Sequence, residues 1–218
     1  MGRQPTIGET MGVEIKRERP LSPVLAGLRV EAVSFAWMVV EAAIGIGSGL
    51  QAHSLSLTAF GMDSLVELVS GAALLWRLGL EARGGKSDAI ETVEGRAERI
   101  VGWALLVLAL YVAITAAREL FVPPRVASTP LGITLLAVSG VLMPYLSRRK
   151  VRIGKEIGSP ALHADGMCSL TCAYMAWTAL AGLLLTGISG WGALDALGAL
   201  ALDVFIVREA LETLRAGD

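Results

Sequence analysis

The sequence predicts an all-α membrane protein with six transmembrane helices, arranged as two inverted three-helix repeats. Of the 218 residues 54% are hydrophobic and only 18% are charged, and the mean hydropathy is +0.60. A soluble domain has about 25% charged residues. The chain also divides into six apolar segments, and a stretch of the second segment recurs in the fifth. We therefore expect one six-helix transmembrane domain over residues 29–214.

The first three apolar segments lie at about Val30–Leu50, Leu55–Trp76 and Ile100–Ala117. A helix needs about 20 residues to cross a hydrocarbon core of about 30 Å, so each segment is a candidate span. Residues 1–28 precede them; this stretch is polar, contains three prolines and lacks the features of a signal peptide. We expect it to be an N-terminal tail in the cytoplasm.

The last three segments lie at about Leu131–Leu146, Pro160–Thr186 and Trp191–Val207. Pro160 suits the first turn of a helix, where a backbone N–H has no helical partner. Only Gly187–Gly190 separates the fifth segment from the sixth, and four residues can form no more than a turn. Eleven residues follow the sixth segment, and we expect no C-terminal soluble domain.

Basic residues predict which connections face the cytoplasm, because Lys and Arg are retained there. Seventeen of the nineteen Lys and Arg lie in four regions: the N-terminal stretch, the second-to-third connection, the fourth-to-fifth connection and the C-terminal end. The other three connections hold only Arg118 and Arg125. The pattern predicts six crossings with both termini in the cytoplasm, and we expect the protein in a bacterial inner (plasma) membrane.

The stretch Ser54–Glu67 (SLSLTAFGMDSLVE) recurs 105 residues later as Ser159–Cys172 (SPALHADGMCSLTC). Seven positions are identical in the two copies. At two other positions the first copy has carboxylates and the second has cysteines, and the i, i+4 spacing puts each pair on one face of a helix. These residues are Asp63 and Glu67 in the first copy and Cys168 and Cys172 in the second.

The predicted topology gives this repeat a meaning, because the second and fifth segments cross the membrane in opposite directions. Inverted repeats are common in secondary transporters, which bind substrate near the midplane between the repeats. Asp63 and Cys168 each lie nine residues after the first serine of their copy, which is about 13 Å along a helix. The two pairs should therefore meet near the centre of the bilayer.

Two carboxylates and two cysteines together form a donor set for a metal ion. Zn²⁺ accepts both ligand types in tetrahedral geometry, and thiolates also favour Cd²⁺ and other thiophilic ions. Ionisable residues at the bilayer centre are costly and usually belong to an ion pathway. Since such ligands lose protons when they bind metal, one site could hold either metal or protons, which is the basis of an exchanger.

Four further side chains are candidates for the ion pathway. Glu41 and Asp203 fall near the predicted midplane and could be extra ligands, proton carriers or hydrogen-bonded packing groups. His163 and Asp165 fall near the predicted cytoplasmic entrance and could form a vestibule or cap the start of the fifth helix. Asp195 is interpreted as a first-turn carboxylate of the sixth helix.

At these residues the sequence resembles the cation diffusion facilitators, which have six spans, cytoplasmic termini and paired ligands on the second and fifth helices. Asp-Ser-Leu-Val-Glu at 63–67 is similar to their second-helix motif. The run at 162–168 is similar to the one leading into their fifth-helix His-x-x-x-Asp, with Cys168 and Cys172 in the ligand places. The resemblance covers about Arg29–Leu214. It implies a homodimeric, proton-coupled exporter of divalent metal, usually Zn²⁺, that works by alternating access without a permanently bound cofactor.

Three features depart from the family pattern. Cys-x-x-x-Cys replaces the usual fifth-helix motif, which extends the expected metals to Cd²⁺ and other thiophilic ions. Glu67 stands where the family usually has Asp. The family's usual cytoplasmic metal-binding domain after the sixth helix is not expected here.

Other functions are less consistent with the sequence. A non-transporting metal or redox sensor that uses Cys168 and Cys172 is the alternative, although the inverted repeat favours transport. Gly-Ile-Ser-Gly at 187–190 matches a motif of intramembrane serine proteases, but a nucleophilic Ser needs a base and no His follows Ser189. We therefore expect no enzyme, and the net charge of −1 gives no indication of a nucleic-acid partner.

Overall fold

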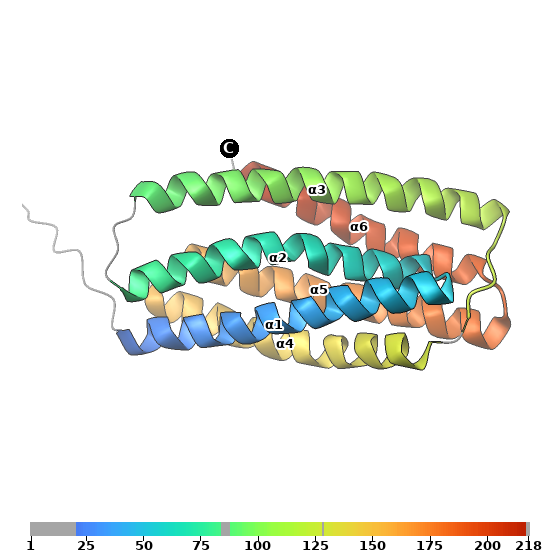
Figure 1. The fold of residues 1–218 in the computed structure, drawn as a ribbon, viewed down its shortest axis with the longest axis horizontal. Coiled ribbons are helices and arrows are strands. Elements are labelled where there is room, and N and C mark those ends of the chain that lie inside the picture. The colour runs from blue at the N-terminus through green and yellow to red at the C-terminus, as the bar shows by residue number, and fades with distance from the viewer. Residues whose placement is uncertain (1–20, 84–87, 128, 217–218) are drawn as a thin grey trace, which may run out of the picture.

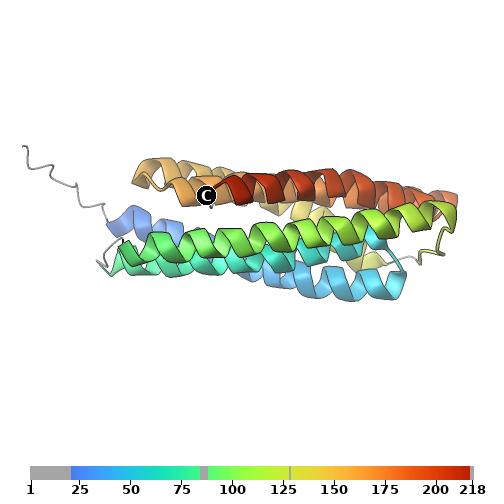
Figure 2. The same cartoon turned by 90° about the horizontal axis from the view of Figure 1, so that it is seen from above.

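The structure, a computed structural model, describes residues 21–83, 88–127 and 129–216. Within these ranges the chain is entirely helical, with no strand. The helices are α1 (Leu21–Ala52), α2 (Leu55–Ala82), α3 (Asp88–Phe121), α4 (Pro130–Ile157), α5 (Pro160–Ser189) and α6 (Ala193–Ala216). They run along one long axis and form an elongated bundle (Figures 1 and 2). The first five are long and apolar enough to cross a membrane, which confirms the predicted all-α membrane fold.

The sixth helix is not among these five candidate spans. It carries the charged residues Asp195, Asp203, Arg208, Glu209, Glu212 and Arg215. Even so, α6 runs along the same axis as the others (Figure 1) and packs on α3 and α5. Its 24 residues extend about 36 Å at 1.5 Å per residue, so α6 is long enough to match a hydrocarbon core of about 30 Å.

Three helices extend well beyond the apolar segments that mark them in the sequence. α1 begins at Leu21, inside the stretch expected to be a tail, and α3 begins at Asp88 in a charged connection. α4 contains Pro144 and continues through the basic connection to Ile157. Lys, Arg and Glu are good helix formers, so a helix need not end where its hydrophobicity ends. Residues 1–20 of the expected tail lie outside the described ranges.

The turns that join α1 to α2 and α4 to α5 have the same construction, 105 residues apart. Each contains one residue with left-handed backbone, His53 with φ 53° and Gly158 with φ 61°. A serine directly precedes each next helix, Ser54 or Ser159, and its hydroxyl accepts a hydrogen bond from the backbone N–H three residues later. The serine amides close each turn by donating to the carbonyls of Gly49 (2.9 Å) and Gly154 (2.8 Å).

The helices joined by these turns also pack in equivalent ways. An added Cβ at Gly61 would lie 2.5 Å from the amide nitrogen of Ile46, and one at Gly166 would lie 3.0 Å from that of Val151. Gly166 and Val151 each lie 105 positions after Gly61 and Ile46, so the second contact is the equivalent of the first. Small residues let two helix backbones approach this closely. The shift therefore relates these turn and glycine contacts of α1 and α2 to those of α4 and α5.

Candidate metal centre

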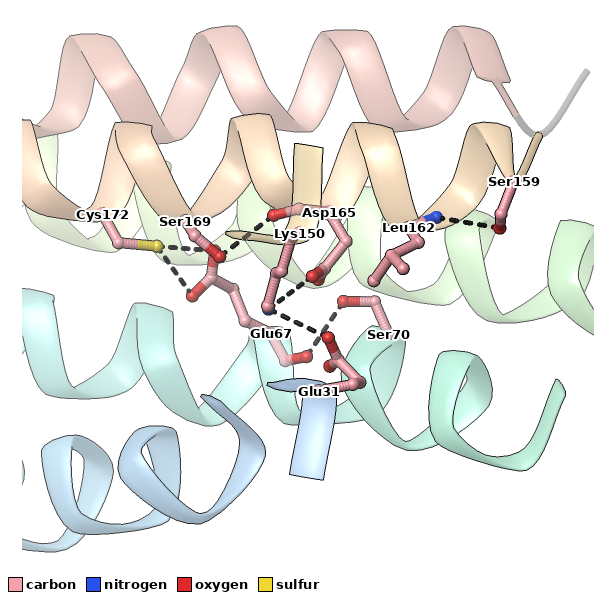
Figure 3. A network of polar contacts seen from close by, with 9 residues as sticks. All are labelled: Glu31, Glu67, Ser70, Lys150, Ser159, Leu162, Asp165, Ser169 and Cys172. Atoms are coloured by element: carbon pink, nitrogen blue, oxygen red, sulfur yellow. Dashed lines mark hydrogen bonds and ion pairs between the residues drawn. The ribbon is translucent and has the colours of Figure 1, made fainter. Parts of the chain in front are cut away.

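The carboxylates of Asp63 and Glu67 and the thiol of Cys172 come together where α2 packs against α5. One donor atom of each residue lies within 4.8 Å of the other two. All three side chains are buried, with exposures of 1%, 6% and 2%. The Cys172 thiol donates to the two oxygens of Glu67 at 3.0 and 3.1 Å (Figure 3). These two residues are 105 positions apart, so equivalent positions of the repeat face each other here.

The carboxylate of Asp63 has no hydrogen-bond partner among the described residues. Both of its oxygens are buried without a hydrogen bond, whereas most buried polar atoms in proteins are paired. Leaving such a group unpaired costs free energy that a cation or a proton would offset. Two carboxylates and a thiol, which mix hard and soft donors, fit a divalent transition-metal ion.

Cys168, the fourth predicted ligand, lies outside this group. It is one turn before Cys172 on α5, but it is partly exposed and faces a cavity. Its side chain lies beside Glu209 of α6. The structure therefore gathers three of the four predicted ligands at one point and turns the fourth towards a different neighbour.

The cavity has a volume of about 620 Å³ and lies between α2, α5 and α6. Titratable side chains gather on its wall. They are Glu67, His163, Asp165, Cys168, Tyr174, Arg208, Glu209 and Glu212. Glu67 therefore belongs both to the buried group and to the cavity wall, and the predicted vestibule residues His163 and Asp165 lie in the same lining.

A buried ion network adjoins the cavity. The ammonium of Lys150 on α4 lies 3.0 Å from a carboxylate oxygen of Glu31 on α1 and 2.5 Å from one of Asp165 on α5 (Figure 3). The side chains of Lys150 and Glu31 are fully buried. The network links three helices and supplies Asp165 with a cation from within the protein.

The other two predicted pathway residues are not members of the three-ligand group. Glu41 on α1 is fully buried and accepts a 2.9 Å hydrogen bond from the indole N–H of Trp37, while its second oxygen has no partner. Asp203 on α6 has one unpartnered oxygen, but it belongs neither to the group nor to the cavity wall. Glu41 is thus a hydrogen-bonded buried carboxylate, and Asp203 is not brought to the centre.

Asp195 has a role that its position in α6 does not suggest. Its carboxylate accepts hydrogen bonds from the amides of Leu55 (2.7 Å) and Ser56 (3.2 Å) and from the hydroxyl of Ser54 (2.8 Å). Asp195 therefore caps the N-terminus of α2, where free N–H groups and the helix dipole favour an anion. This cap holds α6 against the helix that carries Asp63.

Sequence reasoning missed Glu31, Lys150 and Glu209 as buried charged residues. A signal was present for Lys150, because the buried positions of α4 recur every three or four residues through Met143, Leu146, Lys150 and Ile153. That pattern places Lys150 on the inner face once α4 is known to continue through the basic connection.

Comparison with known proteins gives two matches. Residues 32–217 match the family model described as the cation efflux transmembrane domain. An uncharacterized transporter of Synechocystis sp. (strain ATCC 27184 / PCC 6803 / Kazusa) is 26% identical over 188 residues, which cover 80% of this chain. The match covers 61% of that protein, so the chain spans less than two thirds of this relative's length.

Proposed function

The chain belongs to the cation efflux family, and from this premise we propose that it exports divalent transition-metal ions across a membrane in exchange for protons. The observation that carries the proposal is the buried group of Asp63, Glu67 and Cys172, in which the Asp63 carboxylate accepts no hydrogen bond from the part of the chain that the structure describes. A group of this kind needs a cation or protons. The metal ion is the cargo, so no permanently bound cofactor is involved.

Exchange follows from the chemistry of these three side chains. A thiol and a carboxylic acid must lose their protons before they bind a metal ion. Binding on one side of the membrane therefore releases protons there, and reprotonation on the other side releases the metal. The protein alternates between the two loaded states.

The repeated construction of the bundle supports alternating access. The two turns at His53 and Gly158 and the glycine contacts beside them obey the same 105-residue shift. Glu67 and Cys172, which also obey it, touch at the centre. We therefore propose that the halves are inverted repeats that rock about this point, with α6 as the sixth span and both termini in the cytoplasm of a bacterial cell.

The donor set narrows the class of metal. Carboxylates accept Zn²⁺ and harder divalent ions, and a thiolate adds affinity for Zn²⁺ and Cd²⁺. We propose Zn²⁺ as the principal ion and Cd²⁺ as an alternative cargo. Large apolar side chains on the outer face of α3, such as Trp103, Val107 and Leu110, are more than half exposed and suit contact with lipid or with a second copy in a homodimer.

Flux into sealed proteoliposomes tests this proposal. The purified protein should take up Zn²⁺ and Cd²⁺ when a pH gradient is imposed, and collapsing the gradient should slow the uptake. Asp63→Asn should abolish uptake, because it removes a charge and a ligand while keeping the shape of the side chain. The matched control is Glu156→Gln, which changes an exposed carboxylate on α4 in a surface ion pair and should leave uptake unchanged.

The same assay separates a transporter from a non-transporting sensor. Metal that binds to the protein without accumulating inside the vesicles would identify a sensor and reject transport. Uptake by the Asp63→Asn protein at the wild-type rate would place the site elsewhere. Uptake at the same rate with and without the pH gradient would show that metal transport is not coupled to protons.

A further inference from the structure

We propose that Cys168 and Glu209, together with Glu67, form a second binding position for the ion on the wall of the cavity. This inference rests on the proposed transport function and adds a step to it. The ion would occupy this position between the cavity and the buried group of Asp63, Glu67 and Cys172. Glu209, on α6, would thereby become a ligand on a third helix.

The first argument is the burial of Glu209 and the lack of a hydrogen bond to one of its oxygens. Its side chain is 7% exposed, and its Oε2 atom is buried without a hydrogen-bond partner. It lines the cavity and lies beside both Cys168 and Glu67. Its hydrogen-bonding neighbours are the side chains of Cys168 and Glu67, which are themselves metal-competent, and a buried carboxylate oxygen left without a partner is costly.

The cations around the cavity are already engaged, which is the second argument. The guanidinium of Arg208, the residue before Glu209, is 2.8 Å from Glu212 and turned towards solvent, with 74% of its side chain exposed. Lys150 is held in the buried network with Asp165. Asp165 is thereby paired with a cation, whereas among the described residues no basic side chain forms an ion pair with Glu209, so this carboxylate is available to an incoming cation.

The chemistry fits a position that the ion passes through. A thiolate and two carboxylates suit the same thiophilic divalent ions as the buried group. Among the described residues only Asp63, Glu67 and Cys172 have donor atoms that all lie within 4.8 Å of one another, so the donors at the cavity wall are more widely spaced. An ion held there keeps water ligands from the cavity, and the Cys168 proton leaves to that water.

Glu67 connects the second binding position to the buried group. It faces Cys172 in the buried group and also belongs to the cavity wall. An ion bound by Cys168 and Glu209 can keep Glu67 as a ligand while it exchanges the other two for Cys172 and Asp63. Because the ion is never without protein ligands, it can lose its water in the apolar interior without being left uncoordinated.

Titration with Cd²⁺ alone tests the inference, because a Cd²⁺–thiolate bond has an ultraviolet charge-transfer band. The chain has two cysteines, so Cys172→Ser leaves Cys168 as the single source of that band. The full-length Cys172→Ser protein should retain a Cd²⁺–thiolate band. Adding Glu209→Gln should weaken the Cd²⁺ binding that this band reports by about tenfold or more, as loss of a metal-site group does.

Two controls complete the test: a substitution of another carboxylate on the cavity wall, and the same Glu209 substitution in the protein that lacks Cys168. Glu212→Gln removes a carboxylate from the same helix and the same cavity wall, but one already paired with Arg208, and should leave the band unchanged. In the Cys168→Ser protein, where the band comes from Cys172, Glu209→Gln should have less effect than in the Cys172→Ser protein.

Three results would overturn the second position: no thiolate band in the Cys172→Ser protein, equal effects of Glu209→Gln and Glu212→Gln, or equal effects of Glu209→Gln in both cysteine backgrounds. None of these three results tests the proposed function, which is tested by metal uptake into proteoliposomes and by the loss of that uptake in the Asp63→Asn protein. If one of these results is found while metal uptake still depends on Asp63, the second binding position is rejected and the proposed transport function stands.

Discussion

Replacing Lys150 by Met should destabilise the protein far more than its location in a basic stretch of sequence suggests. The ammonium of Lys150 lies 3.0 Å from Glu31 and is also paired with Asp165, and its side chain is fully buried. Met keeps an unbranched side chain of similar length, so the substitution removes the charge without opening a large void. Two carboxylates on two other helices then lose their common cation.

The expected magnitude follows from burial. Removing one partner of a buried ion pair costs about 3–5 kcal/mol, because the remaining charge is left uncompensated. Against a typical free energy of unfolding of about 5–15 kcal/mol, this is a large loss. The control is Arg152→Met on the same helix, whose partner Glu156 is 3.7 Å away and where both side chains are more than half exposed. A surface pair of this kind contributes about 0–1 kcal/mol.

The free energy of unfolding in mixed micelles, measured by denaturant titration, distinguishes the two variants. Lys150→Met should lower it by at least about 2 kcal/mol more than Arg152→Met does. Adding Glu31→Gln and Asp165→Asn to Lys150→Met should recover part of the loss, because no uncompensated charge remains. Equal stability of the two single variants, or a further loss in the triple variant, would refute the role assigned to the network.

Two other predictions concern the metal and the helix packing. Replacing Cys168 by His and Cys172 by Asp should shift relative binding from Cd²⁺ towards Zn²⁺ and Co²⁺ and let metal bind at lower pH, because a free thiol titrates near ~8.5 but His near ~6.5 and Asp near ~3.9. Competition titrations at two pH values check both effects, and an unchanged preference with an unchanged pH profile would remove the cysteines from the site. Gly61→Ala should lower the free energy of unfolding by about 1–3 kcal/mol, because its Cβ would lie 2.5 Å from the amide nitrogen of Ile46. Gly47→Ala on α1, where an added Cβ meets no atom within 4 Å, should cost nothing or stabilise by up to about 1 kcal/mol, and similar losses in both would show that close approach at Gly61 is not required.

Much of the candidate site could be predicted from local spacing. Asp63 and Glu67 lie one turn apart on a single helix, as do Cys168 and Cys172, and a helix alone places each pair on one face. Local spacing does not say which two residues touch between helices. The structure pairs Glu67 with Cys172 and turns Cys168 to the cavity, a difference that depends on the depth and rotation of α2 against α5.

The sequence by itself determined the helical membrane fold, the order of the six helices and the recurrence of the stretch at 54–67, because hydrophobicity and short-range spacing are properties of consecutive residues. Only the tertiary structure decided that Lys150 is buried between Glu31 and Asp165, that Asp195 caps α2, and that Glu209 reaches the cavity. The physical reason is common to all three. Whether a charged side chain is solvated, paired or left without a partner depends on what neighbouring helices place beside it, and those neighbours come from distant parts of the chain.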